Sequence, residues 1–494
     1  MDMHKLLLCV LGLLLLAAFP VTAKATPLTV HGLGNLRRSL AEEDSILSSL
    51  ETFYYNQTLD HFNYQPQSFV TFPQRYLINS KYWGGGNDPI FVYLGGEDVL
   101  EDDITLFGFI HESAPRFKAL VVYLEHRFYG KSVPFVSQRE VLNNNTLRGY
   151  FNIAQALADY AEILLYLKHK LSAPYSPIIV IGASYGGMLA AWFRLKYPHV
   201  AVGALASSAP ILYLDEMVPP DGFFQIVSRD YRESSRSCYE TIKASWDKIA
   251  KVASQPNGLS ILSQKFKSCG NLSDVSDLTS YLVTIYVQNA KFDIPPIYPV
   301  DMICRGIDEA RNETDILDRI FAGLVAIAGN SSCYINASRL TDSNSLLSWS
   351  WQTCSDLVFT ISTGNDTMFP PSSFDIESYI EQCKSAYGVP PRPHWVTTYF
   401  GGYDIKLVLK RFGSNIVFTN GLRDPWSAGG ILENISDSII AVVTKNGSHA
   451  LDLFTAKKTD PEWLMKQRNT SLDIIEGWIY KYYDDLHALN LINN

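Results

Sequence analysis

The sequence lacks the basic runs that are typical of nucleic-acid binding. Its 494 residues carry 41 Lys and Arg against 50 Asp and Glu, a formal net charge of −9, and the basic residues gather only in short pairs such as Arg37-Arg38. Nucleic-acid backbones are bound mainly by clustered positive charge, which this chain does not concentrate. We therefore expect no nucleic-acid partner.

The sequence also lacks the spacings that hold metals or nucleotides. It has no C-x-x-C or H-E-x-x-H pattern, no Walker sequence, and no G-x-G-x-x-G after a strand-like run. Such patterns supply metal ligands, or backbone amides that cradle phosphates, at fixed distances. We therefore expect neither a metal nor an organic cofactor.

Long apolar runs are absent beyond the first 25 residues. The run found there has the length of a secretory signal peptide, and small residues suit cleavage after Ala23 or Ala25. A membrane anchor is the alternative, but the run is short for a spanning helix of about 20 residues. We assign 1–25 to a signal peptide and 26–48 to a polar tail or pro-segment, and we expect no membrane contact once the signal is removed.

Cysteine is sparse and unevenly placed. Of seven cysteines, Cys9 leaves with the signal peptide and six remain, an even number that in an exported chain predicts three disulfides of open pairing. Ten Asn-x-Ser/Thr sequons further indicate a glycoprotein. The six cysteines are Cys238, Cys269, Cys304, Cys333, Cys354 and Cys383. The sequons begin at Asn56, Asn144, Asn271, Asn312, Asn330, Asn336, Asn365, Asn434, Asn446 and Asn469.

Strand-like and helix-like segments alternate from residue 49 to residue 214. Short apolar runs rich in β-branched and aromatic residues, such as 88–96 and 119–127, are typical of strands buried on both faces. The segment 152–171 repeats apolar residues at helical spacing. This alternation predicts βαβ units and a mainly parallel sheet.

The alternation stops at about residue 215. All six mature cysteines follow, in a segment with helical stretches such as 315–328. We interpret 215–385 as an inserted, largely helical unit stapled by disulfides. The segment 386–494, with a closing helix around 471–486, is expected to complete the unit begun by 49–214. Two units agree with the size at which a single core stops growing, about 250–300 residues.

The most specific motif is Gly182-Ala183-Ser184-Tyr185-Gly186. It follows an apolar strand-like run and precedes a helical pattern, the context in which G-x-S-x-G forms a nucleophile elbow. An ordinary glycine-rich turn is the alternative. In the elbow interpretation Ser184 is the nucleophile, and the backbone amide of Tyr185, at the start of the helix, donates to the developing oxyanion.

A serine nucleophile needs a base and an acid that orients the base, and after such an elbow the acid precedes the histidine in the chain. Asp424 lies in a Gly/Pro-rich loop after the strand-like run 415–421, and His449 lies in the loop after the next run. We assign His449 as the base and Asp424 as the acid. Asp452 competes as the acid but lies too close to His449 in sequence. His126 competes as the base but precedes the serine, so we expect it to be structural.

Long, composition-specific stretches run along most of the mature chain, among them LDHFNYQPQSFVTFPQRYL, LEHRFYGKS, GASYGGMLAAWFRLKYPH, NDTMFPPSSFD, GVPPRPHWVTTYFGG, SNIVFTNGLRDPWSAGG and SHALDL. In these stretches the chain resembles the prolyl carboxypeptidase and dipeptidyl-peptidase II family of serine peptidases. The resemblance implies an α/β-hydrolase core that carries a helical cap, and catalysis by Ser184, Asp424 and His449. It also implies cleavage of short peptides next to proline in acidic compartments.

The same resemblance implies a proline pocket lined by Met188, Met368 and Trp426. Thioethers and an indole face suit a compact apolar ring. Plain core packing is the alternative for each of the three residues.

Three positions depart from the family's pattern. Ala450 stands where a second histidine usually follows the catalytic one, and Phe454 stands where an arginine is usual. The family's Asn-Glu-Gly, near the second oxyanion donor, appears here within Gly95–Asp98. These departures leave open the polarity of the pocket and, with it, which end of a peptide is preferred.

The leading interpretation is a serine exopeptidase that releases a C-terminal residue after proline. The alternatives are release of X-Pro dipeptides from N-termini, an esterase on the same core, and an inactive hydrolase-like binding protein, which the intact triad disfavours. The expected partners are short proline-containing peptides. The protein is expected in the secretory pathway and then in a lysosome or vacuole or outside the cell. Its oligomeric state is open, a homodimer included.

Overall fold

The computed structural model describes residues 46–135, 137–310, 315–335 and 344–492. The expected signal peptide, most of the polar tail and the sequons at Asn312 and Asn336 lie outside the described residues. Within these described ranges, no helix is long and apolar enough to cross a membrane.

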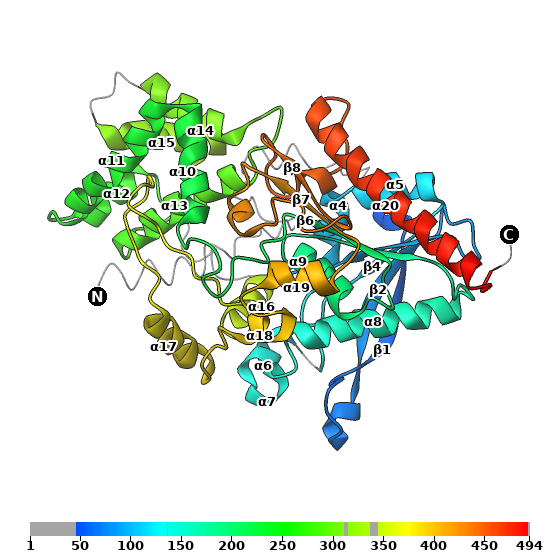
Figure 1. Ribbon diagram of the computed structural model, residues 1–494. Coiled ribbons are helices and arrows are strands. Elements are labelled where there is room, and N and C mark those ends of the chain that lie inside the picture. Colours follow the sequence, from blue (N-terminus) through cyan, green and yellow to red (C-terminus); the bar gives the residue numbers. More distant parts are fainter. Residues whose placement is uncertain (1–45, 136, 311–314, 336–343, 493–494) are drawn as a thin grey trace.

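A mixed sheet of eight strands forms the centre of the molecule (Figure 1). Its strand order is β1-β2-β4-β3-β5-β6-β7-β8. β2 pairs antiparallel with β1 and β4, and the strands from β4 to β8 pair in parallel. The mainly parallel sheet predicted from the alternation is therefore confirmed. The strands are β1 Glu51–Thr58, β2 Thr71–Asn79, β3 Ile90–Leu94, β4 Leu120–Leu124, β5 Ile178–Ala183, β6 Gly203–Ser207, β7 Ile416–Gly421 and β8 Ile439–Thr444.

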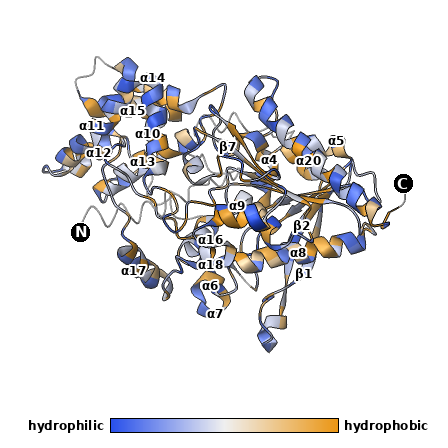
Figure 2. Ribbon diagram, in the orientation of Figure 1, coloured by the Kyte–Doolittle hydropathy of each residue, from blue (hydrophilic) through white to orange (hydrophobic). Residues whose placement is uncertain are grey.

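Helices cover both faces of this sheet. Alternate side chains of one strand point to opposite faces, so Val180 packs in the cluster that includes α8 and α9, whereas Ile179 packs in the cluster of α4, α5 and α20. The inner strands β3, β4 and β5 are hydrophobic along their length (Figure 2), because neither face of them meets water. These helices are α4 Leu100–Leu106, α5 Phe109–Phe117, α8 Ile153–Lys170, α9 Tyr185–Lys196 and α20 Glu462–Ala488.

The closing helix α20 is longer than the sequence pattern predicted. It begins after Pro461, a residue that suits a helix start because it has no N–H to satisfy. Between Glu462 and Thr470 the helix buries one large apolar side chain, that of Leu464. Apolar periodicity therefore marks only its later turns, which pack on the sheet.

The chain between β6 and β7 is helical, and its helices α10 to α15 gather at one end of the sheet (Figure 1). The expected helix at 315–328 is α15. The division of the chain at residues 215 and 385 stays a prediction. The remaining helices are α6 Gln138–Asn143, α7 Asn145–Arg148, α10 Gly222–Ser234, α11 Arg236–Ala253, α12 Gly258–Lys265, α13 Val275–Lys291, α14 Pro299–Glu309, α15 Ile316–Ala328, α16 Asn344–Thr353, α17 Ile376–Tyr387, α18 Trp395–Phe400 and α19 Ile405–Phe412.

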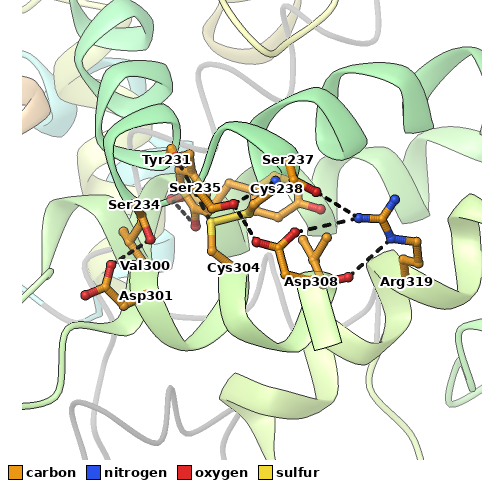
Figure 3. Close-up of a disulfide and its surroundings, with 12 residues drawn as sticks. Tyr231, Ser234, Ser235, Ser237, Cys238, Val300, Asp301, Cys304, Asp308 and Arg319 are labelled. Atoms are coloured by element: carbon orange, nitrogen blue, oxygen red, sulfur yellow. Dashed lines mark hydrogen bonds and ion pairs between the residues drawn. A yellow bond between two sulfur atoms is a disulfide. The ribbon is translucent and has the colours of Figure 1, made fainter. Parts of the chain in front are cut away.

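Three disulfides staple this helical region, as the cysteine count predicted. They join Cys238 to Cys304, Cys269 to Cys333, and Cys354 to Cys383. Figure 3 shows the first, between α11 and α14, flanked by two side-chain hydrogen bonds. The Ser234 hydroxyl donates to Asp301 at 2.6 Å, and the Ser235 hydroxyl donates to Asp308 at 2.5 Å. Covalent and polar links thus fix α14 against the α10–α11 pair.

Candidate active site

Ser184 sits on a strained turn between β5 and α9. Its backbone has φ 56° and ψ −123°, a conformation that costs a non-glycine residue free energy and is typical of functional positions. The Ser184 N–H donates to the carbonyl of Ser207 at 2.9 Å, which fixes the turn to the end of β6. The strand-turn-helix context predicted for the nucleophile elbow is present.

Glycines make this turn sterically feasible. A Cβ on Gly182 would lie 2.1 Å from the carbonyl oxygen of Gly186, and one on Gly186 would lie 2.7 Å from the carbonyl oxygen of Leu94. Neither neighbour can move, because both are backbone atoms inside the sheet and its turns. The two glycines of the motif are therefore required by close approach of the backbone.

His449 and Asp424 form a buried, hydrogen-bonded pair. His449 Nδ1 lies 2.8 Å from Asp424 Oδ2, and the two residues are 3% and 0% exposed. The other carboxylate oxygen of Asp424 accepts the N–H of Trp426 at 3.0 Å. The carboxylate can only accept, so Nδ1 carries the proton and Nε2 is left as an acceptor. This is the tautomer that a general base requires.

The end of β6 brings the loop of His449 to the elbow of Ser184. Ala450, the residue after the histidine, donates its N–H to the Ser208 hydroxyl at 2.8 Å. Ser208 directly follows Ser207, whose carbonyl accepts the Ser184 N–H. Among the described residues, His449 Nε2 has no hydrogen-bond partner, so its bond to Ser184 Oγ is not formed in this structure. Bonds of this kind are often long without substrate and tighten in the complex.

Two competing residues are used elsewhere. Asp452 accepts hydrogen bonds from the hydroxyls of Ser207 and Thr419, at 2.6 and 2.7 Å. His126 is buried, which lowers its pKa to about 4. Its Nδ1 donates to the Arg127 carbonyl at 2.6 Å, and its Nε2 accepts from the Tyr185 hydroxyl at 3.0 Å. His126 thus fixes the side chain of Tyr185, in agreement with the structural role expected for it.

The pKa of His449 is lowered from its ordinary value of 6.5, chiefly by burial. The carboxylate of Asp424 opposes this effect, and the positive charge of Lys291 adds to it. A lowered pKa keeps the imidazole neutral, and hence able to accept a proton, in more acidic solution.

The backbone amide of Tyr185 is the first of α9. It has no acceptor within the helix, because the first amides of any helix lack one, and the helix dipole favours negative charge there. The turn after β3 lies beside it, since a Cβ on Gly96 would be 3.1 Å from the amide nitrogen of Gly186. An oxyanion above Ser184 would therefore meet Tyr185 N–H and the Gly95–Gly96 turn.

Met188, Met368 and Trp426 are all buried in one hydrophobic cluster. Met188 lies one turn after Ser184 on α9, and its N–H donates to the Ser184 carbonyl at 3.0 Å. Met368 is held against α10, where its N–H donates to the Ser228 hydroxyl at 3.0 Å.

A row of aromatic rings joins the elbow to Trp426. The ring of Tyr185 meets Trp349 at 5.4 Å, Trp349 meets Phe359 at 6.2 Å, and Phe359 meets Trp426 at 5.4 Å between centroids. Phe223 of α10 adds an edge contact to Trp426 at 5.0 Å. The sequence did not reveal this row, because Trp349 and Phe359 lie in the insertion without a recognisable motif.

The insertion also supplies the support of the histidine loop. The N–H of His449 donates to the carbonyl of Lys291 at 3.0 Å, and the ring of Phe292 packs edge-on against the imidazole at 6.0 Å. Lys291 is the last residue of α13. The sequence analysis missed both residues; the available signal was a lysine at the end of an apolar helical pattern, shortly before a Pro-Pro pair.

No group of three or more His, Cys, Asp or Glu side chains in the described ranges could hold a metal ion. The chemistry that the residues themselves support is nucleophilic attack by a serine with acid–base help from a histidine. The eight-stranded sheet, the elbow after β5 and the buried His-Asp pair define a serine hydrolase of the α/β-hydrolase class.

The chain belongs to the Serine carboxypeptidase S28 family, whose model matches residues 57–471, and it is a serine-type carboxypeptidase. It is 35% identical over 501 residues to the Lysosomal Pro-X carboxypeptidase of Homo sapiens, with 98% of this chain and 99% of that protein covered. It is 36% identical over 500 residues to the protein of that name from Bos taurus, with 97% and 98% covered. The Prolyl carboxy peptidase like protein 5 of Caenorhabditis elegans is 30% identical over 508 residues, with 95% and 97% covered.

Among solved structures, an acetylester hydrolase from Corynebacterium glutamicum matches with a TM-score of 0.41 at 12% identity, over 88% of this chain and 97% of that one. The fold class rests on the strand order and on the family, not on that likeness.

Proposed function

We propose that this carboxypeptidase releases the C-terminal residue that follows a proline. The observation that carries the proposal is the buried His449–Asp424 pair. Its Nε2 has no hydrogen-bond partner among the described residues, and the end of β6 ties the histidine loop and the elbow of Ser184 together. The specificity for proline is supported by relatives that are named Pro-X carboxypeptidases and that align with this chain over nearly their full length.

In the proposed reaction, Ser184 Oγ attacks the proline carbonyl carbon while His449 Nε2 takes the hydroxyl proton. The negative charge that develops on the carbonyl oxygen is met by the Tyr185 N–H and the start of α9. The C–N bond then breaks, and the proton on Nε2 passes to the leaving nitrogen. The free amino acid departs and the peptidyl-proline remains as an ester on Ser184. A water molecule, deprotonated by His449, hydrolyses this ester.

The proline ring is proposed to pack against the aromatic row near Trp426. Ring faces and thioether side chains are suited to a compact, rigid, apolar ring that has no side-chain hydrogen bond to offer. Met188 is proposed to line the elbow side of this pocket, and Met368 the α10 side.

We also propose that 215–385 acts as a cap over the core formed by 49–214 and 386–494, and that it restricts the enzyme to short peptides. The enzyme is proposed to pass through the secretory pathway to a lysosome or vacuole. The disulfides and the "lysosomal" in the names of its relatives support this route. The lowered pKa of His449 suits an acidic compartment.

The test is a mass-spectrometric digest at about pH 5. One peptide ends in Pro-X and has a blocked N-terminus, a second begins with X-Pro and has an amidated C-terminus, and a third ends in Ala-X. Release of X from the first peptide, and much less from the third, is expected. The Ser184→Ala variant, as the control, should release nothing.

The pocket is tested with the Trp426→Ala variant. Loss of one aromatic contact should lower kcat/KM for the Pro-X peptide by about 10-fold relative to Ala-X. Release of an X-Pro dipeptide from the second peptide alone would replace the proposal with a dipeptidyl-peptidase activity. Equal cleavage of Pro-X and Ala-X by the wild-type enzyme would refute the proline pocket.

A further inference from the structure

Lys291 is a buried cation without a carboxylate partner. Its side chain is 7% exposed, and among the described residues no ion pair joins its ammonium to Asp or Glu; its printed contact is with the ring of Phe292, at 5.0 Å from Nζ to the centroid. Burial lowers the pKa of Lys291. A buried ammonium that forms no close ion pair is costly, which favours an anion that arrives from outside.

The charge of Lys291 acts on the reacting groups. The Lys291 carbonyl accepts the His449 N–H at 3.0 Å, so the lysine backbone touches the histidine loop. The ammonium lowers the pKa of His449 and of Glu97, and the carboxylates of Glu97 and Asp424 in turn act on the ammonium. His449, Glu97 and Asp424 come from three separate segments of the chain. The Lys291 side chain therefore lies where those three segments meet.

The geometry of the reaction limits where the terminal carboxylate of the substrate can lie. The terminal carboxylate of the substrate is three bonds from the scissile carbonyl carbon, which puts it no more than about 4 Å from that carbon. The leaving nitrogen takes its proton from the histidine, so the residue to be released lies on the His449 side of Ser184. Lys291 lies beside that histidine: its carbonyl accepts the His449 N–H, and its ammonium lies 5.0 Å from the centroid of the Phe292 ring, which packs against the imidazole.

A second cation near the triad is already paired. Arg423 precedes the triad aspartate, and its guanidinium lies 2.7 Å from the Asp293 carboxylate. Arg423 thus already has a close carboxylate partner, whereas Lys291 forms no ion pair with Asp or Glu in the part of the chain that the structure describes.

We propose that Lys291 binds the free C-terminal carboxylate of the peptide substrate and so makes the enzyme a carboxypeptidase. This inference rests on the proposed exopeptidase mechanism but not on the preference for proline. The neighbouring Glu97 has a pKa raised by burial, so in acidic solution it competes less for the ammonium. A structural alternative is that Lys291 only neutralises Glu97. In that case replacing Lys291 should affect peptides with a free C-terminal acid and with an amide equally, whereas carboxylate binding affects the acid alone.

The test compares two peptides that differ only at the C-terminus, a free acid and an amide. The wild-type enzyme should prefer the acid, and Lys291→Met should reduce the acid-to-amide ratio of kcat/KM by about 10- to 100-fold, as expected for loss of a hydrogen bond to a charged group. Lys291→Arg should keep most of the ratio. Lys196→Met serves as the control, because Lys196 is an exposed lysine at the far end of α9 whose pKa is also lowered by desolvation.

Binding is measured separately with Ser184→Ala protein. This measurement requires no turnover, and it does not depend on whether a Lys291 variant folds. Calorimetry with the same peptides, and with alanine in place of proline, should show tighter binding of every acid than of its amide. Equal binding of acid and amide would overturn the role of Lys291, as would an equal loss of activity on both peptides in Lys291→Met. Acid-selective binding without a preference for proline would refute the proline pocket alone and leave Lys291 in place.

Discussion

Replacing Asp424 with asparagine should invert the hydrogen bond that orients His449. One carboxylate oxygen of Asp424 accepts the Trp426 N–H at 3.0 Å, and the other accepts His449 Nδ1 at 2.8 Å. In Asp424→Asn the amide oxygen must stay with the Trp426 N–H, because that donor requires an acceptor. The amide NH2 then faces His449 and donates to Nδ1, which moves the imidazole proton to Nε2. A protonated Nε2 cannot take the proton of Ser184.

We expect kcat to fall by about 10³- to 10⁴-fold, the size of effect known for this change in a serine-histidine-aspartate triad. That range corresponds to about 4–5.5 kcal/mol of lost transition-state stabilisation. Substrate binding should change little, since the carboxylate does not face the peptide. The assay is single-turnover release of the C-terminal residue at saturating peptide, with circular dichroism to check the fold.

Asp452→Asn is the matched control, because this buried carboxylate accepts from two hydroxyls and not from the histidine. Hydroxyls can rotate to accept from the new amide, so kcat should stay within a few-fold of wild type. The proposed roles would be refuted if Asp424→Asn kept more than about a tenth of wild-type kcat. They would also be refuted if Asp452→Asn lost as much activity while remaining folded.

Two further predictions concern pH and stability. Burial lowers the pKa of His449 below 6.5, so the acidic limb of kcat/KM against pH should lie below 6.5. The positive charge of Lys291 also lowers this pKa. The Lys291→Met variant removes that charge and should therefore shift the limb to higher pH. Activity that rises without limit into strong acid would contradict His449 as the base. Replacing Cys238 and Cys304 with serine removes a link across 66 residues and should cost about 4 kcal/mol of stability, measured as a lower calorimetric Tm; an unchanged Tm would contradict this.

The parallel part of the fold could be predicted because its strands are buried on both faces. Such strands read as continuous apolar runs, and β3, β4 and β5 are buried along their whole length. The antiparallel pair β1 and β2 at the edge of the sheet had no such signature. β1 alternates exposed, half-buried and buried residues and includes polar side chains, so its pattern resembles that of a loop.

The candidate site likewise has one part that the sequence indicates and one part that it does not. Ser184, Asp424 and His449 could be proposed from the sequence because each follows a strand at the carboxyl edge of the sheet, where backbone constraints leave a motif or a loop of recognisable composition. Lys291 and the aromatic row could not, because they belong to helices and loops of the insertion. Their positions depend on how that insertion packs on the core, and packing of this kind leaves no local pattern in the sequence.

The insertion is joined to both loops that carry the His-Asp pair. The carbonyl of Lys291 holds the backbone of His449 at 3.0 Å, and the carboxylate of Asp293 holds Arg423, next to Asp424, at 2.7 Å. Lys291 and Asp293 are two residues apart, so a single turn of chain at the end of α13 positions both the base and its orienting acid. A shift of that turn would displace the imidazole and the carboxylate together. The end of α13, in the helical chain between β6 and β7, is therefore part of the support of the proposed catalytic pair.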